Sequence, residues 1–227
     1  MVNGRVITKP SFDVMGGDTV TIRSIHNPYV SQGGLKLEHA IRSFSLSFEG
    51  KRVLDVGSST GGFTDCALQH GASEVLAVDV GTLQLHGDLR KDERVILYEN
   101  TNFLDIKTSD LPKEIDLVLV DVSFTSSLPI IKHAFDCLCG PKMVVLLKPQ
   151  FETTERNRRG IVNNPKEHKS ILKRYVQSLE GMAVPMRSLI PSPIKGQHGN
   201  IEFLLHIDTP TTPIDIDAIV DDAWSRD

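Results

Sequence analysis

From residue 52 onward, short apolar runs rich in β-branched residues alternate with segments of helical character. Five runs, "RVLDVG", "EVLAVDV", "RVILYE", "IDLVLVDV" and "MVVLLKP", are apolar almost without interruption, as strands buried on both faces of a parallel sheet are. Helical patterns follow at 61–70, 82–90 and 127–139, and the last one ends at Gly140 and Pro141. Strands that alternate with helices predict a doubly wound α/β sheet.

The rest of the chain adds elements to this sheet. A helix is expected to begin at "NPKE", where Asn164 can cap it and Glu167 can complete a capping box. A last strand, "IEFLLHI", covers 201–207, and the acidic segment 208–227 is expected to be a tail with one short helix over 214–224. The apolar face of the "NPKE" helix comprises Ile171, Leu172, Tyr175, Val176 and Leu179.

The bulk composition fits one main globular domain. The chain has 227 residues, of which 40% are hydrophobic and 24% charged, so it can bury one sizeable core. Its three cysteines neither pair evenly nor show metal-ligand spacing with histidine, which indicates reduced thiols and no metal site. The sequence contains no signal-type apolar segment and no run long enough to span a membrane. We therefore expect a cytoplasmic protein.

The net charge of −4 is unevenly distributed along the chain. Residues 1–52 and 151–200 carry net charges of +3 and +5, whereas residues 53–150 and 201–227 each carry −6. If the fold brings the two basic segments together, they can form one surface that faces an anion. These charges can equally belong to ordinary solvated faces, and the sequence leaves both interpretations open.

A glycine-rich turn, "GSSTGG", follows the first strand of the predicted sheet. Such turns let the backbone approach a nucleotide at the carboxyl end of the strand. A dinucleotide fingerprint needs a glycine where Ser59 stands, which disfavours a nicotinamide oxidoreductase. Asp55 before the turn and Asp79 after the next strand suit the hydroxyls of a nucleoside instead. S-adenosylmethionine is such a ligand, and its cationic sulfonium favours an acidic pocket.

Further polar residues follow the other strands. The segment "ENTNFLD" offers Thr101, Asn102 and Phe103 where an adenine ring would lie, Asp121 ends the fourth strand, and Lys148 ends the fifth. Because the carboxyl ends of parallel strands meet at one edge of a sheet, these residues are expected to line one pocket. A lysine beside an aspartate there is an acid–base arrangement that suits catalysis.

Six motifs, in order, resemble the TlyA (hemolysin A) family, which is related to the FtsJ-type ribose 2′-O-methyltransferases that act on ribosomal RNA. They are "YVSQGGLKLEHA", "VLDVGSSTGGFTDCALQHGA", "VDVGTLQL", "VDVSF", "LLKPQFE" and "GNIEFLL". The resemblance implies a Rossmann-like, S-adenosylmethionine-dependent methyltransferase that acts on ribosomal RNA or ribosomal subunits. The positions that match the family's catalytic Lys-Asp-Lys-Glu tetrad are Lys36, Asp121, Lys148 and Glu202.

The resemblance also implies roles for individual residues. Lys148 would be the base, Asp121 would hold it and orient the hydroxyl, and Lys36 would bind a phosphate or the hydroxyl oxygen. Glu202 would fix a lysine. Together with Asp55, the residues expected to contact the cofactor are Gly57, Ser58, Ser59, Gly61, Phe63, Asp79, Asn102 and Asp121.

Three parts of the chain are expected from this resemblance. Residues 1–25 resemble only the closing strands of an S-four-type RNA-binding domain, residues 26–207 form the methyltransferase domain, and residues 208–227 form the acidic tail. Basic side chains of both positive segments, Lys36 in one and Arg156, Arg158 and Arg159 in the other, would reach phosphates of the RNA.

Other function classes remain as alternatives. The main one is an RNA- or ribosome-binding protein that keeps the methyltransferase fold without catalysis, which would bind the cofactor and transfer nothing. A membrane-lytic activity, which the family name suggests, finds neither a cationic amphipathic helix of the interfacial kind nor a spanning segment in the sequence.

Overall fold

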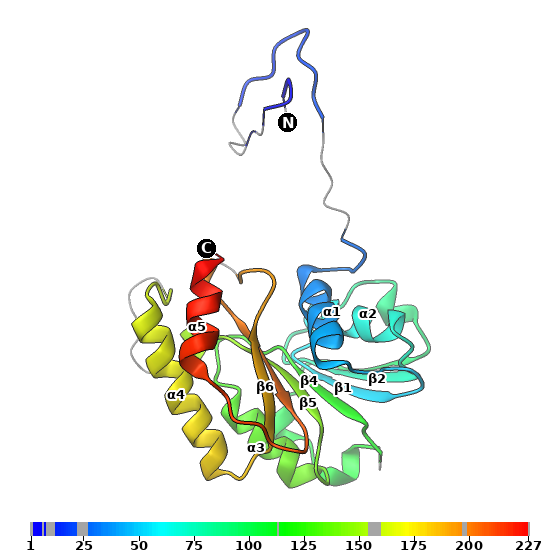
Figure 1. Ribbon diagram of the computed structural model, residues 1–227. Helices are drawn as coiled ribbons and strands as arrows, with labels where there is room; N and C mark the ends of the chain where they lie inside the picture. Colours follow the sequence, from blue (N-terminus) through cyan, green and yellow to red (C-terminus); the bar gives the residue numbers. More distant parts are fainter. Residues whose placement is uncertain are drawn as a thin grey trace.

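The computed structural model describes residues 2–5, 7, 12–21, 27–112, 114–153, 160–196 and 199–226. Its centre is a seven-stranded sheet in the order β3-β2-β1-β4-β5-β7-β6 (Figure 1). Strands β1 to β5 pair in parallel, whereas β7 runs antiparallel to both β5 and β6. The strands are β1 (Arg52–Val56), β2 (Glu74–Val78), β3 (Val95–Tyr98), β4 (Leu117–Val120), β5 (Met143–Leu147), β6 (Met186–Pro191) and β7 (Phe203–Ile207).

Helices cover both faces of this sheet and give two apolar cores. On one face, α1 (Gln32–Phe44) and α2 (Gly62–Gln69) pack on Val53, Leu119 and their neighbours. On the other face lie α3 (Leu128–Cys137), α4 (Pro165–Gly181) and α5 (Ile216–Ser225). Every residue of β4 and β5 is buried, because apolar strands between two helical layers are shielded from water on both faces.

The predicted doubly wound α/β sheet is confirmed, and one predicted helix is wrong. The segment 82–90 forms no α-helix; only a short 3-10 turn, η1 (Leu89–Lys91), occurs there. Leu83 has a φ of 57° and donates its amide to the Glu99 carboxylate at 2.6 Å, so the chain bends at the place where a helix would need regular dihedrals. Two further elements, α1 and β6, are not predicted by the sequence patterns.

The acidic C-terminal segment is not a loose tail, because α5 packs on the body. Ile216, Val220 and Ala223 are buried in the core that α4 also lines. Lys169 on α4 lies 2.8 Å from Asp221, and Lys173 lies 2.8 Å from Asp217. The acids of this segment therefore neutralise part of the basic segment 151–200.

The described residues 2–5 and 12–21 contact one another, and Figure 1 draws them away from the sheet. Val2 makes isolated bridges to Arg5 and to Val20, and the Asn3 amide donates to Asp18 at 2.7 Å. Within the described part of the chain, no helix is both long and apolar enough to cross a membrane.

Candidate active site

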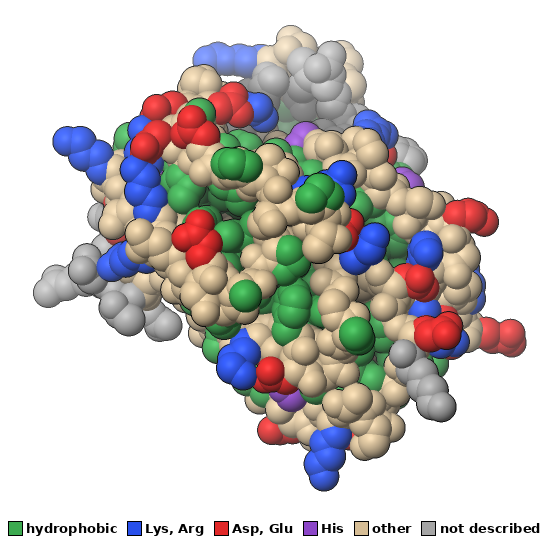
Figure 2. All heavy atoms as spheres, turned by 60° about the horizontal axis from the view of Figure 1, so that its bottom comes forward, with side chains coloured by type: hydrophobic (Ala, Val, Ile, Leu, Met, Phe, Trp, Pro, Cys, Tyr) green, Lys and Arg blue, Asp and Glu red, His purple; other side chains and the backbone are tan. Residues whose placement is uncertain are grey.

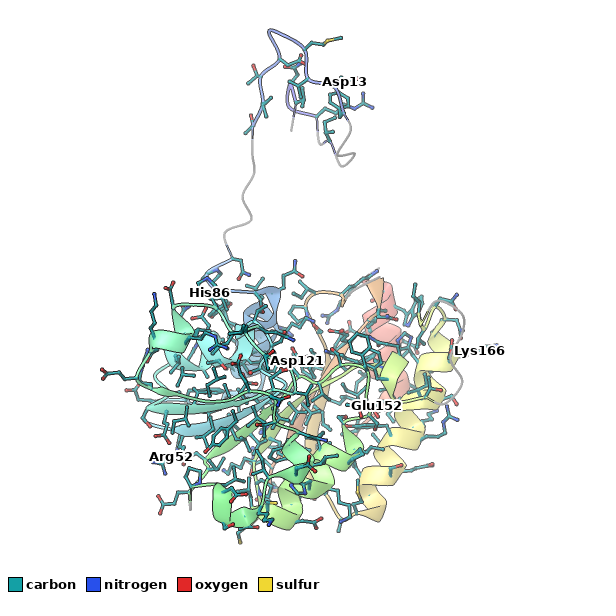
Figure 3. The ribbon with its side chains drawn as sticks, turned by 180° about the vertical axis from the view of Figure 1, so that it is seen from behind. Asp13, Arg52, His86, Asp121, Glu152 and Lys166 are labelled. Atoms are coloured by element: carbon teal, nitrogen blue, oxygen red, sulfur yellow. The ribbon has the colours of Figure 1, made fainter. Side chains whose placement is uncertain are left out.

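A cavity of about 720 Å³ opens where the parallel strands end at their carboxyl edge. Gly57, Asp79, Asp121 and Lys148 follow directly on β1, β2, β4 and β5, and all four line the cavity. Figure 3 shows Asp121 at this edge of the sheet and Arg52, the first residue of β1, at the opposite edge. The topology thus gathers side chains that are far apart in the sequence, as expected for a doubly wound sheet.

The glycine turn brings two loops into contact. Gly57 has a φ of 85°, and a Cβ built on it would lie 2.6 Å from the backbone oxygen of Asp121. Glycine is the only residue that adopts this conformation without strain and also leaves room for the β4 loop. The turn therefore sets the distance between the β1 and β4 sides of the cavity.

Asp79 holds the cavity wall through its carboxylate. Its Oδ2 accepts the amide of Ser59 at 2.8 Å, and its Oδ1 accepts the amide of Gly81 at 2.7 Å. Each oxygen keeps a further lone pair, so the same carboxylate can accept hydroxyl groups of a bound nucleoside. Asp79, Ser59 and Asn102 lie together on the cavity wall, as the sequence predicts.

The two predicted lysines each pair with a predicted carboxylate. The Lys148 ammonium lies 2.7 Å from Asp121 Oδ1 and donates to Ser123 Oγ at 2.8 Å. The Lys36 ammonium, on α1, donates to Glu202 Oε2 at 2.6 Å. All four of the tetrad positions line the same cavity.

These two pairs are neighbours because of the sheet register. Leu147 of β5 pairs with Phe203 of the antiparallel strand β7. Lys148 follows Leu147 and Glu202 precedes Phe203, so both residues lie at the same end of the two paired strands. The Lys36 and Glu202 side chains are only 11% and 3% exposed. Such a pair is stable only when its partners are held in good geometry.

Four predicted cofactor contacts do not line the cavity, namely Asp55, Ser58, Gly61 and Phe63. Asp55 is wholly buried, and its Oδ2 accepts the Thr64 hydroxyl on α2 at 2.6 Å. Burial raises the pKa of Asp55 to about 7, with further contributions from Asp121 and Asp79, while the Thr64 hydrogen bond opposes the rise. In this arrangement Asp55 does not line the cavity, and its carboxylate joins the end of β1 to α2; its expected ribose contact stays a prediction.

The other three of these residues are part of the turn's packing. Ser58 is 5% exposed, and Phe63 is 2% exposed in the core beneath α1 and α2. A Cβ on Gly61 would lie 2.3 Å from Leu89 Cδ1, so this glycine makes room for an apolar neighbour. They shape the turn without facing the cavity.

The cavity also has an exposed aromatic residue that the sequence patterns did not predict. Phe124 lines the cavity yet is 82% exposed, and its ring centroid lies 5.5 Å from that of Phe151. Its φ of 66° is unusual for a bulky residue and marks a site under functional or structural constraint. Its place in the loop after the fourth strand, at the end of "VDVSF", was the signal that could have identified it.

The arginines Arg156, Arg158 and Arg159 lie outside the described residues. Their predicted contact with phosphates therefore stays a prediction. Across the described ranges, no group of three or more His, Cys, Asp and Glu side chains is placed to hold a metal ion.

The cavity fits S-adenosylmethionine. Its volume of about 720 Å³ lies in the range of small-molecule and cofactor sites. The carboxylates of Asp79 and Asp121 on its wall attract a cationic ligand. Ser59, Asp79 and Asn102 would hold the nucleoside, and Asp121 would lie toward the sulfonium.

Comparisons with known proteins agree with this arrangement. Residues 29–209 match the model of the FtsJ-like methyltransferases. YqxC of Bacillus subtilis, provisionally named an rRNA methyltransferase, is 42% identical over 92% of this chain and 75% of its own length. The 16S/23S rRNA (cytidine-2′-O)-methyltransferase TlyA of Mycobacterium tuberculosis is 34% identical over 92% of this chain and 80% of its own.

A solved structure is also close. It belongs to a protein of Streptococcus thermophilus that is provisionally named a hemolysin and is 39% identical to this chain. The two structures superpose with a TM-score of 0.83, and the match covers 92% of this chain and 79% of that chain. The resemblance found in the sequence motifs is therefore confirmed. The chain belongs to the FtsJ-like methyltransferase family, within its TlyA (hemolysin A) branch.

Proposed function

We propose that this protein transfers a methyl group from S-adenosylmethionine to a ribose 2′-hydroxyl of ribosomal RNA. The observation that carries the proposal is the pair of lysine–carboxylate contacts, Lys148 with Asp121 and Lys36 with Glu202, on the wall of one cavity. A ribose hydroxyl is a weak nucleophile, so its methylation needs a base and a fixed geometry. This cavity supplies candidates for both.

Lys148 is the candidate base of the reaction. Bound S-adenosylmethionine would supply the methyl group on an electron-poor sulfonium. The uncharged amine of Lys148 would accept the hydroxyl proton, while the Asp121 carboxylate and the Ser123 hydroxyl, at 2.7 and 2.8 Å, hold its Nζ in place. Asp121 would then stabilise the ammonium that forms.

Lys36 would contact the substrate as the second lysine of the cavity. Its ammonium is held by Glu202 and keeps further donors for a phosphate or for the ribose oxygen. Because only RNA carries a 2′-hydroxyl, this chemistry itself selects RNA over DNA.

The substrate class follows from the relatives and fits the cavity mouth. The Mycobacterium tuberculosis relative is named for cytidine 2′-O-methylation in 16S and 23S rRNA, which makes a ribosomal cytidine the first target to test for this chain. The exposed ring of Phe124 at the cavity offers an aromatic face on which an unstacked base can lie. Such a target would place the enzyme with ribosomes in the cytoplasm.

The predicted S-four-type segment at residues 1–25 would add RNA affinity to this site. Two short bridges around Val2 and basic residues such as Arg5 and Lys9 support this part of the proposal. This segment would bind the phosphate backbone of the RNA, because lysine and arginine side chains contact phosphates without reading the base sequence.

The decisive experiment measures methyl transfer from labelled S-adenosylmethionine to intact ribosomes, separated subunits and naked ribosomal RNA, and then maps the modified nucleotide. We expect transfer to one of these substrates. Lys148→Ala should keep cofactor affinity near that of the wild type and lower the single-turnover rate by at least about 10²-fold, the lower range for loss of a general base.

Lys148→Arg is the matched variant, because guanidinium keeps the charge but cannot accept the proton. We expect it to be as inactive as Lys148→Ala. Near-normal transfer by Lys148→Arg would show that Lys148 acts only as a positive charge. A wild-type protein that binds the cofactor but methylates none of the substrates would favour the alternative, a non-catalytic RNA- or ribosome-binding protein.

A further inference from the structure

Glu152 joins the two loops that carry the candidate catalytic residues. It ends the short turn η4 (Pro149–Phe151), which begins directly after Lys148. Its Oε1 accepts both the amide of Ser127 at 2.8 Å and the Ser127 hydroxyl at 2.7 Å, and its Oε2 accepts the hydroxyl of Ser126 at 2.5 Å. Ser126 and Ser127 belong to the β4 loop, which also carries Asp121.

A residue of α4, Tyr175, supports the contact between Glu152 and Ser127. The Tyr175 hydroxyl lies 2.6 Å from Ser127 Oγ, and the two residues are each 2% exposed. Since the single hydroxyl proton of Ser127 goes to Glu152, Tyr175 must be the donor to Ser127. Burial raises the pKa of Tyr175, so the phenol keeps the proton that it donates. The resulting chain runs from Tyr175 through Ser127 to Glu152.

The two loops need such a connection because the sheet no longer joins them there. The last pair between β4 and β5 is Val120 with Val145, so Lys148 lies three residues beyond it. Past this point, the Lys148 contacts to Asp121 and Ser123 depend on how the loops lie relative to each other. Besides the Glu152 contacts, the Phe124 and Phe151 rings also meet across the two loops.

We propose that Glu152 is a positioning residue that holds the Ser123-bearing loop against the Lys148-bearing loop, and so fixes the distances around Lys148. Figure 3 labels Asp121, which follows β4, and Glu152, which follows η4, near each other. This inference rests on the proposed methyl transfer, and it adds Glu152 to the residues that determine the rate of that reaction. A misplacement of about 1 Å in a reacting group can lower a rate on the order of 10²-fold.

An ordinary role as a helix cap must be separated from this positioning role. Ser127 is the N-cap of α3, and a carboxylate at a helix N-terminus stabilises the helix wherever it occurs. Glu167 provides the matched control, because it is a partly exposed carboxylate in the first turn of α4 that Asn164 contacts at 3.1 Å. It does not line the cavity.

The test compares single-turnover methyl transfer and cofactor affinity in Glu152→Ala, Glu152→Gln and Glu167→Ala. We expect Glu152→Ala to lower the rate at least about tenfold with cofactor affinity unchanged. Glu152→Gln keeps an oxygen acceptor for Ser127 and should recover much of the rate. Glu167→Ala should leave the rate unchanged. A Glu152→Ala rate within a factor of about two of the wild type overturns the proposal.

A double-mutant cycle with Ser123→Ala separates positioning from general destabilisation. If Glu152 acts by holding Ser123 against Lys148, the fall in rate caused by Glu152→Ala should be clearly smaller in the Ser123→Ala background. Purely additive effects would mean that Glu152 does not act through this contact. If Glu152→Ala fails to fold, Ser127→Ala, which removes the shared hydroxyl and keeps the charge, replaces it in the cycle with the same expectations.

Hydrogen exchange provides a readout that does not depend on catalysis. The Ser127 amide is bound to Glu152, so Glu152→Ala should speed exchange in the peptide 122–128. Unchanged exchange there would contradict the connection itself. If the wild type transfers no methyl group to any RNA, the proposed function fails, and faster exchange in the variant still supports the contact between the loops.

Discussion

The two lysines of the cavity differ in how their charges are balanced. The Lys148 Nζ is held by Asp121 and by the Ser123 hydroxyl, whereas the more deeply buried Glu202 has the Lys36 ammonium within 2.6 Å. Removing one partner of a buried pair leaves the other charge uncompensated, which costs about 3–5 kcal/mol of stability. Variants at Lys36 and Glu202 therefore change stability as well as activity, while Lys148 gives the cleaner test of chemistry.

At Asp79 the structure predicts a loss of cofactor affinity. Asp79→Ala removes a carboxylate that faces the cavity and that also holds the amides of Ser59 and Gly81. S-adenosylmethionine binding, measured by calorimetry, should weaken by about 1.5–3 kcal/mol, the range for hydrogen bonds to a charged group. Asp136→Ala, an exposed acid paired with Lys132 on α3, is the control and should bind normally. Unchanged affinity in Asp79→Ala would remove Asp79 from the cofactor site.

At Asp55 the structure predicts a pH dependence of stability. Its pKa is raised from 3.8 to about 7 in the folded protein by burial, so the folded state holds the proton more tightly than the unfolded state. The stability that Asp55 contributes is therefore complete below about pH 4 and is lost as the pH rises through 7, with a slope of up to about 1.4 kcal/mol per pH unit.

The measurement is urea unfolding of wild type and Asp55→Asn at several pH values. Asparagine is neutral and nearly isosteric, so the variant should gain stability relative to the wild type as the pH rises from 5 to about 8. Two unfolding free energies that stay parallel across this range would show that Asp55 is already ionised in the folded protein.

At the scale of elements, α5 is held to α4 by a contact that depends on protonation. The indole of Trp224 donates to His168 Nδ1 at 3.3 Å, and the two rings lie 5.6 Å apart. Burial lowers the pKa of His168 below 6.5. The contribution of this neutral histidine to stability is therefore complete above pH 6.5 and is lost as the pH falls below it, since the unfolded state then binds the proton better.

The chain's only tryptophan is Trp224, so its fluorescence reports directly on α5. We expect the urea midpoint of the wild type to drop between pH 7.5 and 5.5 relative to that of His168→Gln, whose amide stays neutral and can still accept the indole proton. The expected difference is up to about 1.4 kcal/mol per pH unit. Identical pH profiles for the two proteins would exclude His168 as the group responsible.

The sequence predicts the buried strands well because each one is a continuous apolar run. All six predicted strands occur, whereas β6 was missed because it is no continuous apolar run: Arg187 and Ser188 interrupt it, and only Met186, Leu189 and Pro191 are buried. It is the last strand of the sheet. Helix α1 was not predicted, because Gly33 and Gly34 in its first turn are poor helix formers. A Cβ on Gly34 would lie 2.2 Å from the Tyr29 ring. Packing, which is not visible in local sequence, required glycine in that helix.

The site residues, too, include some that the sequence pattern predicts and some that it does not. Strand ends and topology are sufficient to predict that Asp79, Asp121 and Lys148 lie together. Lys36 and Glu202 are 166 positions apart, and only the family resemblance connected them. The sequence did not indicate the burial of Asp55. Side chains alternate along a strand, and at this position the side chain contacts Thr64 on α2.

At the scale of the whole molecule, opposite charges are intermixed. On the face drawn in Figure 2, acidic and basic side chains lie beside one another around apolar patches, so this face presents no field of a single sign. Within the basic segment 151–200, Lys169 and Lys173 are already paired with acids of α5. The net charge of that segment therefore overstates the positive charge that is free to meet RNA.

This distribution predicts which basic residues control the salt dependence of RNA binding. Replacing Arg156, Arg158 and Arg159 together with alanine should flatten the slope of log affinity against log salt by about 0.7 to 0.9 for each phosphate that the protein no longer neutralises. Lys169→Ala with Lys173→Ala is the matched control from the same segment, and it should leave the slope unchanged because Asp217 and Asp221 already balance those charges. Fluorescence anisotropy with a ribosomal RNA fragment at several salt concentrations measures both slopes. An equal change in the two variants would mean that RNA responds to the summed charge of the segment, and an unchanged slope in the arginine variant would show that those residues do not touch phosphate.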